Sequence, residues 1–366
     1  MRIGFIKGYA LGDVVRCTSI VRKLVQQYPE AEIVWFTSFE AVTLIDHFTP
    51  RMLVVQISDN ERIQSLPDFD WVISLDEELC SAALATRLKT RKLSGAYLAR
   101  DGTVNFTDDL EAWFGMGLLG LTRSRTIADV NLLKQDNDES CLSLLYRGLG
   151  LPLPIHRPVI RVSAAERLQA RRSFLAQGVQ DGERPIGLFL GGSSRWGRKP
   201  WLPAQVRDIL EGLMLSFDQR FAIVGGPTEA KCFAELKAIR FSQYSPIIVE
   251  VDSVRMMAAT VSEFQLLVTT DSLPMHLAIA AGVPVIALFG PTSAAEIDVF
   301  DKGAKIETAL TCRRCYLRKC EQREDCRDGI SVERIEAATR DILSRAAPRP
   351  EWKHPSDNNP LNLFFG

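Results

Sequence analysis

The feature that most constrains the fold is a series of short apolar runs, each ending in a polar turn and followed by a segment with helical spacing. In the second half of the chain these runs lie at 185–190, 220–224, 247–251, 265–269 and 284–289. Short continuous apolar runs bounded by Gly, Pro, Ser and Thr are typical of parallel strands buried on both faces. The first half carries the same pattern at 2–7, 32–37, 53–57 and 71–75. The sequence therefore predicts an α/β protein with two doubly wound, Rossmann-like domains.

A proline-rich segment separates the two halves. Residues 151–158 include three prolines, which disfavour helix and stiffen the chain. We expect an N-terminal domain over 1–158, a C-terminal domain over 159–345 and a tail over 346–366. Doubly wound sheets bind ligands at the carboxyl ends of their strands, so the active site is expected in a central cleft between the two domains.

Composition excludes several classes of protein. Lys and Arg total 44 against 45 for Asp and Glu, so no global basic field marks a nucleic-acid binder. The start of the chain lacks the pattern of a signal peptide, and no apolar run approaches the roughly 20 residues that cross a bilayer. We expect a cytoplasmic protein, with peripheral contact to the inner face of the cytoplasmic membrane left open. The eight cysteines are expected as thiols or metal ligands rather than disulfides.

The segment 269–278 indicates an anion site. It reads Thr-Thr-Asp-Ser-Leu-Pro-Met-His-Leu-Ala, an apolar strand that ends at Asp271 and Ser272 with a helix directly behind them. Side-chain oxygens and the N-terminus of a helix then meet at one point, where a phosphorylated ligand is favoured. His276, in the first helical turn, is either a structural histidine or part of this site, and in the site we expect it to be neutral.

Two further polar turns follow strands of the same half. The loop 191–201 offers glycines, the hydroxyls of Ser193 and Ser194, and Lys199, which can neutralise charge on a departing diphosphate. Taken alone, this loop is equally well explained as flexible and solvated. The turn 225–229 ends in Glu229. Three polar turns at one rim of one domain favour a binding site.

The turn 8–13, between the first strand and the first helix, contains two glycines and Asp13. It lacks the three glycines of a dinucleotide-binding turn. Asp13 is expected to cap the helix, to act as a general base at the mouth of the cleft, or to do both, since the two roles are compatible.

These motifs together resemble glycosyltransferase family 9, the heptosyltransferases, from Met1 to about Ala338. The matching segments are 11–13, 199–201, 225–229, 271–276 and 289–292. The resemblance implies the GT-B fold, with an N-terminal domain that binds the acceptor and a C-terminal domain that binds the nucleotide sugar. It further implies inverting transfer of heptose from ADP-heptose to the inner core of lipopolysaccharide, with no catalytic metal.

The same resemblance implies roles for individual residues. Asp13 would activate the acceptor hydroxyl and Lys199 would hold the diphosphate. The residues that would line the donor site are Ser193, Ser194, Asp271, Ser272 and His276, with Glu229 as a contact to the ribose.

Two clusters have less specific patterns. Arg87, Lys89, Arg91 and Lys92 are expected either to attract an acidic acceptor or to form a solvated helix face. Cys312, Cys315, Cys320 and Cys326 include a C-x2-C spacing that suits structural zinc or iron, while reduced thiols or an adventitious disulfide are the alternative.

Other functions remain as alternatives. A nicotinamide-dependent dehydrogenase is disfavoured because its glycine motif is missing. A transferase of the same fold that modifies a protein or another surface glycan is the second hypothesis. A non-catalytic binder of nucleotide sugars is the third, and the presence of both Asp13 and Lys199 argues against it.

Overall fold

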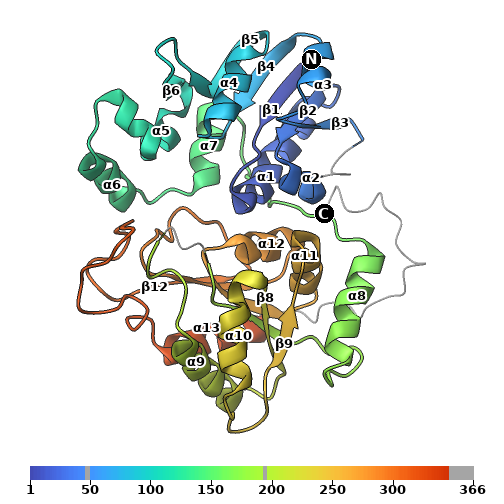
Figure 1. The fold of residues 1–366 in the computed structure, drawn as a ribbon, viewed down its shortest axis with the longest axis vertical. Coiled ribbons are helices and arrows are strands. Elements are labelled where there is room, and N and C mark those ends of the chain that lie inside the picture. Colours follow the sequence, from blue (N-terminus) through green and yellow to red (C-terminus); the bar gives the residue numbers. More distant parts are fainter. Residues whose placement is uncertain (46–49, 193–195, 346–366) are drawn as a thin grey trace.

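The computed structural model describes residues 1–45, 50–192 and 196–345, which form two α/β units, one above the other in Figure 1. Each unit contains a six-stranded sheet, ordered β3-β2-β1-β4-β5-β6 in the first and β9-β8-β7-β10-β11-β12 in the second. The strands of the first sheet are β1 (Arg2–Ile6), β2 (Glu32–Thr37), β3 (Met52–Gln56), β4 (Phe69–Ser74), β5 (Thr90–Leu98) and β6 (Val104–Phe106). Those of the second are β7 (Ile186–Phe189), β8 (Phe221–Gly225), β9 (Ile247–Glu250), β10 (Leu266–Thr270), β11 (Val285–Phe289) and β12 (Ala304–Glu307). Neighbouring strands of these two sheets pair in parallel except β5 with β6, so both predicted doubly wound sheets are confirmed.

Helices connect and cover the strands. In the first unit they are α1 (Leu11–Gln27), α2 (Phe39–Ile45), α3 (Asn60–Ser65), α4 (Leu79–Arg87), α5 (Glu111–Phe114), α6 (Ile127–Asp136) and α7 (Cys141–Leu149), with the 3-10 turns η1 (Asp108–Leu110) and η2 (Leu118–Arg123). In the second they are α8 (Ala164–Leu175), α9 (Pro203–Ser216), α10 (Ala230–Lys237), α11 (Val254–Ser262), α12 (Leu273–Ala281) and α13 (Val332–Arg345), with η3 (Pro227–Glu229). The apolar stripe of α1 is fully buried at Val14, Ile20, Val21 and Leu24, as its helical spacing predicts.

Three strands differ from the sequence prediction, which did not include them. β5 begins with Thr-Arg-Lys and contains Gly95, so charge and a strand-weakening residue conceal its buried centre. β6 and β12 are only three and four residues long, too short to show a periodic pattern. All three lie at or next to the last positions of their sheets.

The two units pack against each other through one continuous apolar core. Buried side chains from one face of each sheet form a single cluster that includes Phe5 and Trp35 of the first unit and Leu267 and Val285 of the second. The opposite faces of the two sheets have separate clusters. This shared core holds the two units together, with the carboxyl ends of β1 and β10 facing the boundary between them.

Helices α1 and α12 meet at that boundary (Figure 1). A Cβ atom added to Gly12 would lie 2.5 Å from Cδ2 of His276, so no side chain fits between the helices at this point. Arg255 of α11 also donates to the carbonyl of Thr43 across the boundary, at 3.1 Å.

Helix α7 packs on α1 and α5, whereas α8 packs on α11 and β9. The domain boundary at residue 158 stays a prediction. Among the described residues, no helix combines the length and apolarity needed to span a membrane. The tail predicted over 346–366 lies outside the described residues.

Candidate active site

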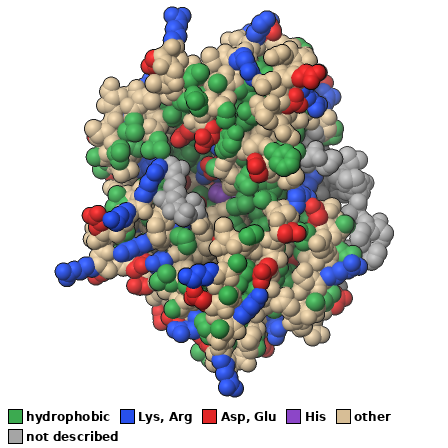
Figure 2. Space-filling view, viewed as in Figure 1, with side chains coloured by type: hydrophobic (Ala, Val, Ile, Leu, Met, Phe, Trp, Pro, Cys, Tyr) green, Lys and Arg blue, Asp and Glu red, His purple; other side chains and the backbone are tan. Residues whose placement is uncertain are grey.

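Two cavities meet at the boundary between the units. The larger, of about 1180 Å³, is lined mainly by turns of the second unit, and the smaller, of about 290 Å³, by residues of both units. They share five lining residues, Ala10, Asp13, Trp196, Asp271 and His276. The space-filling view shows the hollow at this boundary, with acidic side chains on its upper rim and a histidine inside (Figure 2). A reaction that joins two bound molecules would occur where the cavities meet.

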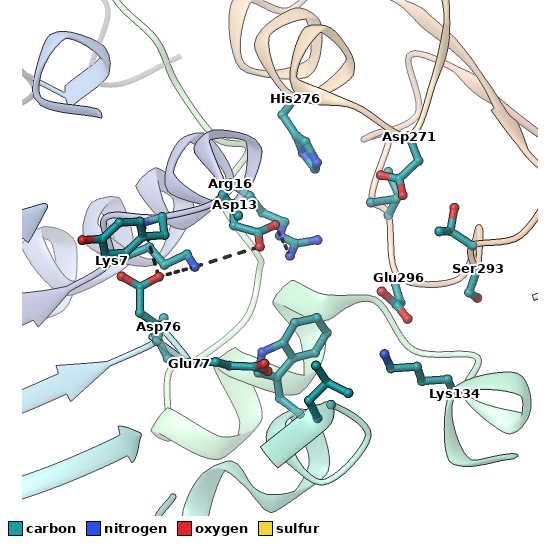
Figure 3. Close-up of a pocket in the computed structure, with 18 of the residues that line it drawn as sticks. Lys7, Asp13, Arg16, Asp76, Glu77, Lys134, Asp271, His276, Ser293 and Glu296 are labelled. Carbon is teal, nitrogen blue, oxygen red and sulfur yellow. Dashed lines mark hydrogen bonds and ion pairs between the residues drawn. The ribbon is translucent and has the colours of Figure 1, made fainter. Parts of the chain in front are cut away.

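Asp13 lies at that junction, in the first turn of α1 (Figure 3). The cap interpretation is wrong, because Ala10 occupies the N-cap position and no side chain caps this helix. Instead, the Asp13 carboxylate accepts a hydrogen bond from Arg16 at 2.6 Å, and Lys7 Nζ lies 4.0 Å away. About a third of the Asp13 side chain is exposed. A carboxylate held by cations and open to a cavity can accept a proton from a bound hydroxyl group.

The electrostatics of Asp13 keep it ionised. Burial raises the pKa of its carboxyl, but Arg16 and Lys7 outweigh that effect, and the net pKa lies below its ordinary value. The Asp13 carboxyl group is therefore deprotonated throughout the neutral range.

A buried carboxylate that sequence reasoning missed, Asp76, supports this arrangement. It accepts hydrogen bonds from Lys7 Nζ at 2.6 Å, the backbone N–H of Gly8 at 2.7 Å and Ser81 Oγ at 3.1 Å. Asp76 is 1% exposed. It therefore fixes the turn between β1 and α1, and with it the position of Asp13.

Lys199 and Asp271 form an ion pair on the wall of the larger cavity. Lys199 Nζ donates to the Asp271 carboxylate at 2.8 Å, and both side chains are mostly buried. Burial raises the pKa of Asp271, but Lys199 and His276 outweigh it and lower the value to about 2. Thr270, beside Asp271, donates to the carbonyl of Gly191 at 2.7 Å and so ties the two polar turns together.

Ser272 and His276 line the larger cavity at the start of α12. Ser272 Oγ donates to the carbonyl of Thr270 at 3.0 Å and makes no capping bond. Burial, followed by repulsion from Arg16, lowers the pKa of His276 to about 4. His276 is therefore neutral at pH 7, as the sequence predicted.

Glu229 also lines the larger cavity. Its carboxylate accepts from the backbone N–H of Gly226 at 2.9 Å and from Thr228 Oγ1 at 2.8 Å. The structure thus brings Glu229 to the same cavity as Lys199, Asp271 and Ser272. Ser193 and Ser194 lie outside the described residues.

The structure does not bring the basic cluster to either cavity. Arg87 ends α4, and Lys89, Arg91 and Lys92 lie just before or at the start of β5. They are therefore near the amino-terminal ends of the strands, whereas the cavities lie at the carboxyl ends. Arg91 pairs with Asp70 at 3.3 Å, and Lys92 Nζ lies 4.1 Å from the ring centre of Trp71. The alternative of a single helix face is wrong, because the chain changes from helix to strand within the cluster.

The four late cysteines lie in the segment that follows β12. All four are free thiols, and burial raises the pKa of Cys326 to about 11. Within 1–45, 50–192 and 196–345, no group of three or more His, Cys, Asp or Glu side chains is arranged to hold a metal ion. Cys312, Cys315 and Cys320 are partly exposed.

Sequence reasoning missed seven charged residues that line the smaller cavity: Lys7, Arg16, Asp76, Glu77, Glu78, Lys134 and Glu296. Lys7 directly follows β1, and Asp76 follows β4 by two residues. Ligands bind at the carboxyl ends of parallel strands, and this rule, which predicted Asp271, predicts these two residues as well. Arg16 interrupts the apolar stripe of α1 one turn after Asp13, and an isolated charge on a buried face is a signal in itself. Glu296 follows β11 by seven residues and has no such local signal.

Comparison with known proteins relates this arrangement to a family. The model described as glycosyltransferase family 9 (heptosyltransferase) matches residues 116–325, more than half of the chain. Lipooligosaccharide heptosyltransferase 2 of Campylobacter jejuni is 19% identical over 352 residues, which cover 92% of this chain and 96% of that protein. The protein of the same name from Haemophilus influenzae is 25% identical over 144 residues, and this match spans 38% of the chain and 41% of the relative.

Solved structures share the fold. A glycosyl transferase family 9 protein from Veillonella parvula superposes with a TM-score of 0.69 and 19% identity, covering 94% of this chain and 97% of that one. E. coli ADP-heptose lps heptosyltransferase II superposes with a TM-score of 0.64 and 18% identity, and the match covers 94% of this chain and 99% of that one. E. coli heptosyltransferase WaaC with ADP-2-deoxy-2-fluoro heptose superposes with a TM-score of 0.52 and 15% identity, and the match covers 95% of this chain and 100% of that one. The two parallel-sheet units are therefore those of a GT-B fold.

Proposed function

The chain belongs to glycosyltransferase family 9, and we propose that it transfers heptose from ADP-heptose to a hydroxyl group of the lipopolysaccharide inner core, with inversion at the anomeric carbon. One observation carries the proposal: Asp13 of the first unit and Asp271 and His276 of the second line both cavities at the point where these meet. That junction offers a base to an acceptor on one side and a polar, helix-terminated cavity to a donor on the other.

The larger cavity is the donor site in this proposal. Its volume suits a nucleotide sugar, and it combines apolar walls at Val224, Val251 and Met257 with Lys199 and the N-terminus of α12. A cation and a helix N-terminus both favour a diphosphate. Glu229 accepts hydrogen bonds from ribose hydroxyls. Two solved relatives support this donor, because one is an ADP-heptose lps heptosyltransferase and the other was solved with ADP-2-deoxy-2-fluoro heptose.

The transfer step follows from these positions. The acceptor hydroxyl oxygen attacks the anomeric carbon while its proton passes to the carboxylate of Asp13. The bond between that carbon and the diphosphate oxygen breaks on the opposite face, which inverts the configuration. ADP leaves with the bonding electrons, and Lys199 with the N-terminus of α12 stabilises the negative charge that develops on it.

The cellular setting and the cysteines are part of the same proposal. The protein acts in the cytoplasm, where it receives a lipid-linked acceptor at the inner face of the membrane. The donor-site chemistry requires no metal, because Lys199 meets the charge of the diphosphate. A structural zinc or iron at Cys312, Cys315, Cys320 and Cys326 stays a prediction, which elemental analysis of the purified protein would test.

Acceptor-dependent release of ADP tests the proposed reaction. The purified chain is given ADP-, UDP- and GDP-sugars, each with Kdo-lipid A or with a heptosylated core as acceptor. We expect release only from ADP-heptose, with a product heavier by one heptose. Turnover with a protein or another surface glycan, and not with either core, would favour the second hypothesis. Binding of ADP-heptose with no turnover on any acceptor would favour a non-catalytic binder.

A further inference from the structure

Arg16 is a buried cation among the apolar side chains of α1. It lies one turn after Asp13 and between the buried residues Val15 and Cys17, and only 8% of it is exposed. Taking a guanidinium group out of water is costly, and an apolar side chain would suit this stretch of the helix better. Core packing therefore does not explain why this position holds an arginine.

The hydrogen bonds of Arg16 do not make it an efficient stabilising group either. Its Nη2 donates to Oδ1 of Asp13 at 2.6 Å, but its buried Nε makes no hydrogen bond within the described residues. A buried ion pair recovers its desolvation cost only where the geometry is good and the remaining donors are satisfied. A side chain retained in spite of this cost points to a function.

The two carboxylate oxygens of Asp13 have different surroundings. Oδ1 accepts from Arg16, whereas Oδ2 lies 4.0 Å from Nζ of Lys7, beyond hydrogen-bond length (Figure 3). Lys7 donates instead to Asp76, at 2.6 Å. Within residues 1–45, 50–192 and 196–345, Oδ2 of Asp13 accepts no hydrogen bond, so its lone pairs stay available.

The surroundings of the Arg16 guanidinium group fix its place. Its central carbon lies 5.6 Å from the ring centre of Trp113 in α5, within the range of a cation–π contact. The thiols of Cys17 and Cys141 are close enough to act on its charge. Burial raises the pKa of both thiols, that of Cys17 to about 12, so both are neutral at pH 7. The guanidinium group therefore has a fixed position from which it can orient a carboxylate.

Resting on the proposed function, we infer that Arg16 is a positioning residue: it holds Oδ1 of Asp13, so that Oδ2 is the atom that takes the proton of the acceptor hydroxyl. The hydrogen bond fixes the rotation of the carboxylate and leaves the oxygen without a charged donor as the better proton acceptor.

The step is balanced at named atoms. As the acceptor oxygen bonds to the anomeric carbon, its proton bonds to Oδ2 of Asp13, and ADP leaves with the electrons of the bond that breaks. Arg16 then favours the return of the carboxyl group to its charged form, because a nearby cation stabilises the carboxylate.

The charges around Asp13 determine the pH dependence that this role predicts. Burial raises the pKa of its carboxyl, and Arg16 has the largest opposing effect. The other charged or titratable groups that face this pair are Lys7 after β1, Asp271 after β10, His276 of α12 and Glu296 after β11. Removing the charge of Arg16 therefore raises the pKa of Asp13, and activity is lost at a higher pH as the pH falls.

The pH profile of kcat for Arg16→Met tests this role, with ADP-heptose and a heptosylated core as substrates. The acidic limb should lie about one to three pH units above that of wild type. On the plateau kcat should fall by about 10- to 100-fold, while KM stays within about twofold, because the base is misplaced and the ligand contacts remain.

Arg22→Met is the matched control. It removes another arginine of α1, which donates to the carbonyl of Arg157 at 2.7 Å and lines neither cavity. Its acidic limb and kcat should match those of wild type. An acidic limb in Arg16→Met that coincides with that of Arg22→Met would overturn the inference.

A second variant separates charge from orientation. Arg16→Lys keeps the buried charge, so its acidic limb should stay close to that of wild type, while kcat falls by about tenfold because the planar donor is lost. A wild-type kcat in Arg16→Lys would contradict the orienting role. Because Arg16 also lowers the pKa of His276, the profiles are repeated in a His276→Gln background. Disappearance of the shift there would assign it to His276 and overturn the inference.

Chemical rescue gives a readout that a merely structural arginine would not move. In Arg16→Ala, whose fold is checked by circular dichroism, millimolar guanidinium should raise kcat at least tenfold. Urea, which has the same shape and no charge, should not, and guanidinium should not rescue Asp13→Asn. Equal rescue by urea and guanidinium, or none by guanidinium, would mean that Arg16 supports the fold rather than the base.

The proposed function and this inference fail in different ways. If the wild-type protein releases no ADP from ADP-heptose with either lipopolysaccharide core acceptor, the proposed reaction fails. If the wild-type protein reacts and Arg16→Met reacts with the same acidic limb and the same kcat, the reaction stands and the role of Arg16 is refuted.

Discussion

The two units share one strand order but bring different chemistry to their common boundary. The first unit places charged, ion-paired side chains at this boundary. Lys7, directly after β1, is held by Asp76, and Arg16 of α1 is held by Asp13. The second ends its strands in glycines, hydroxyls and an ion pair, Lys199 with Asp271. In our proposal, the same topology supports proton transfer on one side and binding of a phosphate group on the other. Both units place an aspartate after the fourth strand of the sheet order, Asp76 and Asp271, each paired with a lysine, so the units differ in the residues around these pairs.

The two cavities show the same contrast. The wall contributed by the first unit is tightly bonded before any ligand binds, since Asp76 alone accepts from Lys7, Gly8 and Ser81. The cavity of the second unit is about four times larger and rimmed by turns. We expect substitutions in the first unit to change the reaction rate or the stability, and those in the second to change ligand affinity.

Asp13→Asn is expected to have the largest effect. The amide keeps the shape of the side chain but cannot accept the proton, so kcat should fall by about 10³-fold, within the range for loss of a general base. Steady-state kinetics with ADP-heptose and a heptosylated core measures this. A variant with more than a tenth of the wild-type kcat would remove Asp13 from the base role.

Asp76→Ala tests the rigidity of the first unit. It leaves Lys7 buried without its closest carboxylate, and breaking such a pair costs about 3–5 kcal/mol of the free energy of unfolding. Urea denaturation measures that loss. The control is Glu30→Ala, which removes an exposed ion pair with Arg51 and should cost less than about 1 kcal/mol. Equal losses in the two variants would show that Asp76 has no special structural part.

The stability of the boundary should depend on pH through His276. Its pKa is about 4 in the folded chain against an ordinary 6.5, so the unfolded chain binds a proton first as the pH falls. Stability conferred by the neutral ring is complete above pH 6.5 and is lost between 6.5 and about 4, by about 3 kcal/mol at 1.4 kcal/mol per unit. His276→Gln should flatten denaturation midpoints over this interval. The same slope in wild type and variant would exclude His276 as its source.

Gly12→Ala should have a smaller effect on stability at the contact between α1 and α12. The new methyl group would meet His276, and such overpacking costs about 1–3 kcal/mol. In the double variant with His276→Ala the clash is relieved, so the two losses should not add. Thermal unfolding of both single variants and of the double variant measures the coupling, and strict additivity would mean that the two helices do not press on each other here.

The sequence predicted the parts of this comparison that depend on local pattern. Asp271 and Ser272 directly follow the buried strand β10, and Lys199 precedes helix α9. The sequence patterns of these elements are clear, and all three residues line the larger cavity. The pairing of Asp13 with Arg16 could have been read from their spacing of three residues on one helix. Glu296 could not, because its place depends on the packing of Tyr316 and Cys141 from distant segments.

The basic cluster shows the opposite case, in which a local pattern misled. Lys89, Arg91 and Lys92 are close in sequence to the acidic residues 76–78 of the smaller cavity, yet they lie at the amino-terminal ends of the strands. The charge of these residues did not predict their position, because that position is set by strand β5, which the sequence did not predict. Whether a residue lies at the amino-terminal or the carboxyl end of a strand says more about its function than its charge does.

The division of labour between the two units is tested most directly by the affinity for ADP of two variants, measured by titration calorimetry. Asp13→Asn belongs to the first unit and should bind ADP within about twofold of wild type. Lys199→Met belongs to the second and should bind ADP at least tenfold more weakly, because it removes the cation that meets the diphosphate. Unchanged binding in Lys199→Met, or a matching loss in Asp13→Asn, would contradict the assignment of donor and base to separate units.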